Sequence, residues 1–295
     1  MTRSILSLCL VFLAGCAALP MVEVASANQN GRVQYLVFHF TTVPFDESMR
    51  LLTQRTERPV SAHYLVPEPG DPTYPHRRLK IFKLVPEDQR AWHAGRSFWG
   101  GRRWLNGPSI GIEIVNQSRC ESREPDAEVQ TPEMQDCTWR EFPDGQIDRV
   151  VRLTQDILER HPGIDAVDVV GHSDVAPTRR LDPGPLFPWK RLYEQGIGAW
   201  YDDDTAAAYL SRFKDDPPSL ELVQRALRAY GYELDATGKL DLQTRFVVRA
   251  FQMHFRPTSF DGRIDPESTA ILFALLEKYR PRALNDLLKE LPGPA

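Results

Sequence analysis

A short apolar run that ends in a histidine sets the strongest limit on how this chain folds. Val167-Asp168-Val169-Val170 has the composition of a buried strand, and it stops at Gly171-His172. Open α/β sheets hold ligand sites beyond the carboxyl ends of their strands, so His172 is placed for function rather than for the core. The following loop carries Asp182 among four prolines that stiffen it, Pro177, Pro183, Pro185 and Pro188. A stiff loop suits a preformed metal or catalytic site.

Other apolar runs predict an α/β domain, a mixed central sheet flanked by helices, over residues 31–197. Strands are expected at residues 33–40, 60–66, 79–85, 109–115 and 167–170. Helices are expected from Asp46, across Ile147 to Leu158 and around Trp189. His39 lies near the end of the first strand. Glu113 lies between two isoleucines in the fourth, where a carboxylate is destabilising unless it has a partner or a chemical role.

The C-terminal third predicts a second, smaller domain. We interpret residues 198–218 as a linker, because acidic and proline-rich runs bracket them, although residues 206–213 have helical composition. Apolar residues at helical spacing predict a three-helix domain over residues 219–280, and residues 281–295 are expected to be a tail. A domain of this size is marginal but feasible alone.

The first thirty residues predict export and a lipid anchor. A positive start and the apolar run Ile5 to Leu13, too short to span a bilayer, are typical of a signal peptide over residues 1–15. Leu13-Ala14-Gly15-Cys16 resembles the lipobox of bacterial lipoproteins, which implies lipidation of Cys16 and a tether over residues 16–30. Ala17 then favours the outer membrane, with the protein facing the periplasm. Ala25-Ser26-Ala27 is a competing cleavage site.

Cysteine usage and charge narrow the classes of function. Cys120 and Cys137 are the only cysteines beyond the leader, and an oxidising compartment favours a disulfide between them, with two free thiols as the alternative. Neither has a second cysteine or a histidine at the spacing of a zinc site. The net charge of −4, with lysine and arginine dispersed along the chain, argues against nucleic-acid binding.

His39, Glu113, His172 and Asp182 together predict a catalytic centre. Two imidazoles and a carboxylate are the ligands of catalytic zinc, which keeps one position open for a water of lowered pKa. Glu113 would carry that water's proton to a leaving nitrogen, and Arg180 would stabilise the oxyanion. From the spacing alone, strand-end histidines that only hydrogen-bond in a polar cleft remain the alternative, because no short ligand motif is present.

Five strings in order resemble the zinc-dependent N-acetylmuramoyl-L-alanine amidases related to phage lysozyme-amidases and peptidoglycan recognition proteins. They are Leu36 to His39, Val60 to Val66, Trp92 to Gly95, Ser109 to Glu113, and Gly171 to Asp174 with Asp182 to Pro185. The resemblance covers residues 31–197. It implies that His39, His172 and Asp182 bind zinc. It also makes Glu113 the acid/base. The family usually has a lysine two residues before the aspartate, whereas this chain has Arg180, whose charge persists but whose reach differs.

The remaining polar residues carry weaker predictions. By resemblance, Trp92 and His93 line the substrate cleft, with ordinary rim packing as the alternative. His63 is grouped with them as a packed or supporting histidine rather than a metal ligand. We expect the other histidines to be solvated, namely His76, His161 and His254. Ser173 and Asp174 are too close in sequence to His172 to form a hydrolase triad with it.

The C-terminal helices resemble the peptidoglycan-binding domains appended to cell-wall hydrolases, with a purely structural cap as the alternative. Binding the wall would raise the effective substrate concentration. The predicted function is therefore hydrolysis of the amide between N-acetylmuramic acid and L-alanine in peptidoglycan or muropeptides. One rival is a receptor or scaffold that binds peptidoglycan without cutting it. The other is a glycosidase with two carboxylates, Glu113 among them.

Overall fold

A computed structural model describes residues 19, 21–126, 128 and 131–290 of the 295-residue chain. The predicted signal peptide and Cys16 lie outside the described residues. The chain divides into two units, residues 1–30 and residues 31–295. In the first, residues 21–30 are exposed and form neither helix nor strand. Among the residues described, no helix has the length and apolarity needed to cross a membrane.

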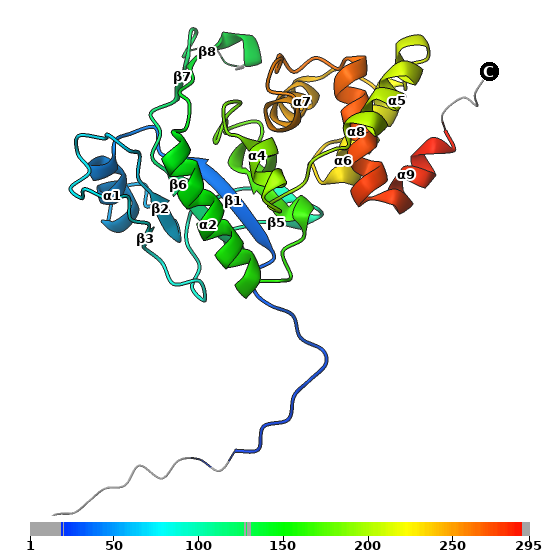
Figure 1. Ribbon diagram of the computed structural model, residues 1–295. Coiled ribbons are helices and arrows are strands. Elements are labelled where there is room, and N and C mark those ends of the chain that lie inside the picture. Colours follow the sequence, from blue (N-terminus) through cyan, green and yellow to red (C-terminus); the bar gives the residue numbers. More distant parts are fainter. Residues whose placement is uncertain (1–18, 20, 127, 129–130, 291–295) are drawn as a thin grey trace, which may run out of the picture. The chain divides into compact units, whose positions relative to one another are not determined.

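A five-stranded sheet forms the centre of the second unit (Figure 1). Its order is β3-β2-β6-β1-β9, with β1 at Tyr35–Phe40, β2 at Tyr64–Val66, β3 at Phe82–Lys83, β6 at Ser109–Ile114 and β9 at Val169–Gly171. All neighbours are parallel except β2 and β3. The interior strands are mostly apolar because both faces of the sheet are covered, and His39 and Glu113 are exceptions in β1 and β6. The mixed sheet flanked by helices is thus confirmed.

All five strands are shorter than the sequence predicted, β2 and β3 most of all. Ser61 bonds to Trp92 instead of to a strand: Ser61 N–H donates to Trp92 O (3.2 Å), and Trp92 N–H donates to Ser61 Oγ (2.9 Å). His63 N–H still donates to Gly111 O of β6 (3.0 Å), just before β2 begins at Tyr64. β3 keeps only two of the seven predicted residues. The last strand begins at Val169 because Ala166–Asp168 forms a short 3-10 helix, η2.

The predicted helices α1 (Phe45–Thr53), α2 (Asp144–Arg160) and α4 (Trp189–Glu194) are present. The first two follow a proline and carry acidic side chains in the first turn and an arginine in the last, which complements the helix dipole. α2 lies across one face of the sheet in Figure 1 and buries one apolar stripe, which includes Ile147, Val150 and Ile157.

Two hairpins lack any sequence period that predicts them. One pairs β4 (Phe98–Trp99) with β5 (Arg102–Arg103), and the other pairs β7 (Arg119–Ser122) with β8 (Gln135–Thr138). A short 3-10 helix, η1 (Pro132–Met134), precedes β8. Cys120 and Cys137 face each other across the second hairpin and form a disulfide.

The C-terminal region contains α5 (Asp203–Asp215), α6 (Leu220–Tyr230), α7 (Leu242–Phe255), α8 (Pro266–Tyr279) and α9 (Pro281–Leu288). The three central helices are those predicted. Each begins at a residue whose side chain accepts a backbone N–H of the first turn, namely Ser219, Asp241 and Asp265. The predicted linker contains α5, because Phe213 is fully buried against Phe273 of α8. The predicted tail contains α9 for the same kind of reason, since Leu284 and Leu287 are buried.

The sheet domain and the C-terminal helices share one apolar core. Trp99 of β4 contacts Tyr230 and Tyr232, at ring-centroid distances of 5.9 and 4.8 Å, and its indole N–H donates to Val167 O. Gly231, at φ 156°, lies under the same indole, where a Cβ would come within 2.7 Å of the ring. Residues 198–218 therefore do not separate two independent bodies.

Candidate active site

The register of the sheet brings His39, Glu113 and His172 to one edge. His39 of β1 is in register with Glu113 of β6. Phe38 is in register with Gly171 of β9, so His172, the next residue and the first of α3 (His172–Val175), lies level with His39. Neighbours in register on parallel strands project from the same face. Asp182 joins them from the proline-rich loop, whose backbone is bonded to α3 through Ser173 N–H and Asp182 O (2.8 Å).

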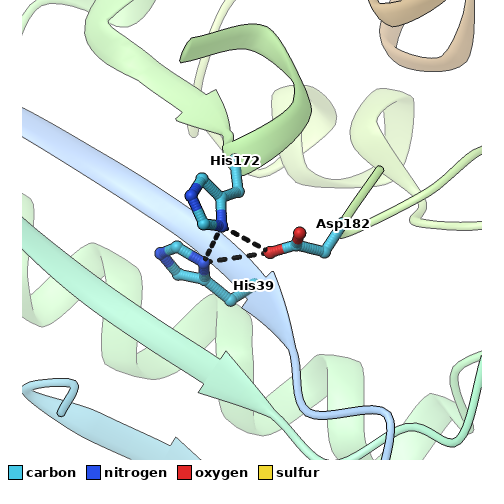
Figure 2. Close-up of side chains that lie close together, drawn as sticks. All are labelled: His39, His172 and Asp182. Atoms are coloured by element: carbon cyan, nitrogen blue, oxygen red, sulfur yellow. Dashed lines mark hydrogen bonds and ion pairs between the residues drawn. The ribbon is translucent and has the colours of Figure 1, made fainter. Parts of the chain in front are cut away.

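Three atoms of these residues meet at one point, as Figure 2 shows. His39 Nδ1, His172 Nδ1 and Asp182 Oδ2 are each 3.0 Å from the other two. All three side chains are buried. The sequence separates His39 from the other two by more than 130 residues, and the fold brings the three together.

Hydrogen bonds on the far side of each ring fix where the protons are. His172 Nε2 lies 3.2 Å from Ala94 O, which can only accept, so Nε2 carries the proton. In the tautomer with its proton on Nε2, the Nδ1 atom of His172 carries a lone pair. The carbonyl of Ala94 also accepts a hydrogen bond from Arg179.

A longer chain of bonds gives the same result for His39. Ser109 Oγ donates to Leu105 O, so Ser109 accepts from His93 Nε2–H (3.0 Å). His93 Nδ1 therefore accepts from His39 Nε2–H (2.9 Å), and Nδ1 of His39 also holds a lone pair. Gly111 makes this chain sterically feasible, because a Cβ there would lie 2.4 Å from the His93 ring.

The charge states agree with this proton count. Burial, followed by the nearby His172, lowers the pKa of His39 to about 4, so this ring is neutral at pH 7. Burial alone would raise the pKa of Asp182, but His172 and His39 outweigh it and hold the pKa below its usual range. Three lone pairs, one on an anion, thus face one another without a proton to share. A divalent cation with nitrogen and oxygen ligands fits this set, because it would satisfy all three at once.

Glu113 and Arg180 complete the predicted site. Glu113 Oε2 is buried and has no hydrogen-bond partner among the described residues. Burial raises the pKa of Glu113 well above its ordinary value, the charge of Asp182 raises it further, and Arg180 opposes both. Arg180 is exposed, and its side chain forms no hydrogen bond or ion pair with the described residues, while its backbone N–H donates to Ala176 O (3.0 Å). A buried carboxyl group with a raised pKa is suited to acid/base chemistry.

The three residues predicted to contact substrate differ in exposure. Trp92 is 48% exposed, whereas His93 and His63 are buried. His63 Nδ1 accepts from Gly111 N–H, and its Nε2 donates to Gln89 O, so both ring nitrogens are already bonded. His93 supports His39 as described above. Substrate contact by these residues stays a prediction.

The sequence prediction was wrong about His254, which is buried rather than solvated. Asp174 Oδ2 accepts from His254 Nδ1–H (2.8 Å) and Gly171 N–H (2.7 Å), and Asp174 Oδ1 accepts from Tyr232 O–H (2.7 Å). His254 and Tyr232 belong to the C-terminal helices and their loops, so these bonds join that region to the residue two positions after His172. As predicted, Asp174 forms no triad with His172.

His161 also differs from the prediction, because its Nε2 lies 2.8 Å from Glu87 and its side chain is mostly buried. His76 is exposed, as predicted. A feature of the sequence could have exposed the error at His254. Seven of the ten residues 246–255 are apolar, a composition that favours a helix buried on most sides, and the structure buries all ten.

Fold and site together define a class, an α/β hydrolytic enzyme with a candidate metal centre at the carboxyl edge of its sheet. Residues 29–185 match the N-acetylmuramoyl-L-alanine amidase family, and residues 216–272 match a peptidoglycan binding domain family. The chain belongs to the N-acetylmuramoyl-L-alanine amidase family.

Relatives cover most of the chain. The N-acetylmuramoyl-L-alanine amidase AmiD of Escherichia coli is 42% identical over 251 residues, which are 84% of each chain. The structure of AmpDh3 from Pseudomonas aeruginosa in complex with anhydromuramic pentapeptide has a TM-score of 0.78 at 44% identity, and the match covers 87% of this chain and 96% of that one. The complex of E. coli AmiD with anhydro-N-acetylmuramic acid-L-Ala-D-gamma-Glu-L-Lys has a TM-score of 0.73 at 39% identity, covering 87% and 93%.

Proposed function

We propose that this chain hydrolyses the amide bond between N-acetylmuramic acid and L-alanine in peptidoglycan or its muropeptide fragments, as part of cell-wall turnover. The observation that carries the proposal is the convergence of His39 Nδ1, His172 Nδ1 and Asp182 Oδ2 beside the buried carboxyl group of Glu113. The amidases named above support the choice of bond, since two of the related structures hold muramyl peptides.

His39, His172 and Asp182 would hold zinc. Bound there, zinc supplies a Lewis acid and lowers the pKa of a water towards about 7. Ala94 O, His93 and Ser109 keep the two imidazoles in the tautomer and orientation that this requires.

Glu113 would move the proton. Two observations support this role: Glu113 is in register with His39, and burial raises its pKa well above the ordinary value, which favours proton exchange. It would take the proton of the attacking water and give it to the leaving nitrogen of L-alanine. Arg180 has unoccupied donors and would stabilise the negative charge that develops on the carbonyl oxygen.

The C-terminal helices would hold the enzyme on the wall, and a lipid on Cys16 would hold it at the membrane. The lipobox-like Leu13 to Cys16 supports an outer-membrane lipoprotein that faces the periplasm. In this proposal, Cys16→Ala moves the protein from the membrane fraction to the soluble periplasmic fraction. Retention of the variant in the outer membrane counts against the anchor.

The decisive experiment is mass spectrometry of products from purified sacculi incubated with the protein lacking residues 1–16. We expect free peptides that begin with L-alanine, lost after chelation and restored by zinc. New reducing ends that survive chelation would point to a glycosidase. Intact wall that retains bound protein would identify a receptor.

A further inference from the structure

A cavity of about 230 Å³ adjoins the metal site and is strongly basic. Its charged lining consists of Arg119 of β7, Arg179 and Arg180 of the proline-rich loop, Arg249 of α7 and Asp182. The single carboxylate among them, Asp182, already belongs to the cluster of acceptors described above. We call this space the arginine cavity. Its charged residues come from three parts of the chain: the disulfide hairpin, the proline-rich loop and the C-terminal helices.

Arg249 is the unusual member of this lining. It is 94% buried, since its relative exposure is 6%. Among the described residues, its side chain makes one hydrogen bond, from Nη1 to Oε1 of Gln135 (2.6 Å), and its Nε is buried without a partner. No carboxylate of the described residues forms an ion pair with it. Burial, with Arg245 adding to it, lowers the pKa of Arg249 to about 10, so the group stays charged at neutral pH.

Arg256 shows what a buried arginine in the same region normally has. It is buried to a similar degree, and it forms ion pairs with Asp265 (2.6 Å) and Glu267 (3.1 Å). A buried charge is destabilising unless an opposite charge compensates it. The chain thus supplies a counterion to Arg256 and none to Arg249.

The other arginines differ in how many donors they have free. Arg179 is committed to the carbonyls of Ala94 and Arg96. Arg119 lies 3.7 Å from Glu121, and both side chains are exposed. The donors free to meet a ligand in the cavity are therefore those of Arg249, Arg119 and Arg180.

We propose that the arginine cavity binds a carboxylate of the substrate's peptide, and that Arg249 of the C-terminal helices is its principal contact. The inference rests on the proposed function. In the peptide L-Ala-D-γ-Glu-L-Lys, the glutamate is linked through its side chain, which leaves its α-carboxylate free one residue beyond L-alanine. One residue spans at most about 3.6 Å, so this carboxylate stays close to the cleaved bond. The arginine cavity is equally close to the candidate metal site, because Asp182 belongs to both. A guanidinium binds a carboxylate through two parallel hydrogen bonds.

Two substrates test the proposal in the full chain purified in detergent: anhydro-N-acetylmuramic acid-L-Ala-D-γ-Glu-L-Lys, and the same compound with the glutamate α-carboxylate converted to an amide. We expect the wild type to prefer the carboxylate form by roughly 10- to 100-fold in kcat/KM. In Arg249→Gln, this ratio falls close to 1, and in Arg249→Lys it is intermediate. The control Arg225→Gln removes an exposed charge from the same region and keeps the wild-type ratio.

Folding and binding measurements complete the test. The melting temperature of Arg249→Gln should be no lower than that of the wild type, because the change removes a buried charge that lacks a counterion. A wild-type ratio near 1, or a ratio unchanged by Arg249→Gln, overturns the inference. If the wild type cleaves neither substrate, the proposed function fails instead, and calorimetry with the peptide L-Ala-D-γ-Glu-L-Lys decides. Roughly tenfold weaker binding by Arg249→Gln then supports the carboxylate site, and equal binding overturns it.

Discussion

Two buried clusters of histidine and aspartate begin two residues apart in the chain, at His172 and at Asp174, and they are satisfied in opposite ways. Asp174 receives three protein hydrogen bonds, from His254, Tyr232 and the backbone of Gly171. The cluster of His39, His172 and Asp182, the candidate metal site, instead turns three acceptor atoms towards one point, while the ring N–H groups point outwards. A buried carboxylate that receives enough hydrogen bonds, such as Asp174, stabilises the packing of the segments that donate them. A buried carboxylate that faces other acceptors, such as Asp182, needs a cation from outside the chain.

Removing the metal should have the largest effect on activity and stability, and it should act through the cluster of His39, His172 and Asp182 rather than through the Asp174 cluster. We expect a chelator to abolish turnover. Relative to protein with free zinc at about 1,000 times its Kd, it should also lower the free energy of unfolding by about 4 kcal/mol. Thermal unfolding and product analysis with and without zinc check both effects. Asp182→Asn is the control, because zinc should neither stabilise nor activate it. Turnover by protein shown to be metal-free contradicts the assignment.

Glu113→Gln should come next, because it removes the proton carrier and keeps the ligands. The amide has nearly the same shape but cannot accept a proton, so kcat should fall by about 10²- to 10⁴-fold. Metal content, measured by elemental analysis, should equal that of the wild type. The buried Oε2 of Glu113 has no hydrogen-bond partner among the described residues, so the melting temperature should not fall. Full activity in this variant would remove Glu113 from the mechanism.

Tyr232→Phe probes the second cluster and should affect stability before activity. Loss of the hydroxyl leaves Asp174 Oδ1 without its donor, which should cost about 1–3 kcal/mol in the free energy of unfolding. Tyr209→Phe is a matched control, because Tyr209 makes the same 2.7 Å bond to Glu277 at an exposed position, and its loss should cost under about 1 kcal/mol. Urea unfolding measures both. Equal losses would mean that burial of the cluster adds nothing.

Like Asp174, Glu87 is a carboxylate that accepts several protein hydrogen bonds, and its contribution to stability should be smaller and should depend on pH. Burial alone would raise its pKa, but hydrogen bonds from Arg160, Tyr64 and His161 outweigh it and lower the pKa to about 2 from 4.5. A carboxylate whose folded-state pKa is depressed stabilises fully above its unfolded pKa, and the stabilisation is lost as the pH falls towards the folded one.

The stability difference between the wild type and Glu87→Gln should therefore shrink by about 1–2 kcal/mol as the pH falls from about 5 to about 2, with partial exposure of Arg160 limiting the effect. Urea unfolding of both proteins at several pH values in this range is the measurement. A difference that stays constant with pH would show that these bonds do not depend on the charge of Glu87.

The sequence predicted the elements whose signal is local. β1 and β6 are recognisable as apolar runs, and His39 and Glu113 are noticeable because they interrupt those runs. The order of the strands then follows from ordinary α/β geometry. Asp182 could be chosen because prolines surround it.

The parts that sequence reasoning missed depend on contacts between distant residues. His93 supports His39 from 54 residues away, and His254 reaches Asp174 from 80 residues away. Contacts at these sequence separations produce no pattern in the local spacing of residues. Arg249 looks like one more solvated arginine until α7 is placed against the hairpin. The linker prediction had a different cause: acidic residues mark both ends of α5, while the apolar stripe between them, which includes Phe213, is short.

The contact at Trp99 limits how evolution or an engineer could recombine this chain. Peptidoglycan-binding modules are usually pictured as interchangeable attachments, yet here Tyr230, Gly231 and Tyr232 are shaped around an indole that the sheet domain supplies. A graft that replaces only the C-terminal helices would leave that indole facing a surface not made for it. The β4–β5 hairpin and the C-terminal helices would have to be transferred together, so selection acts on them as one unit.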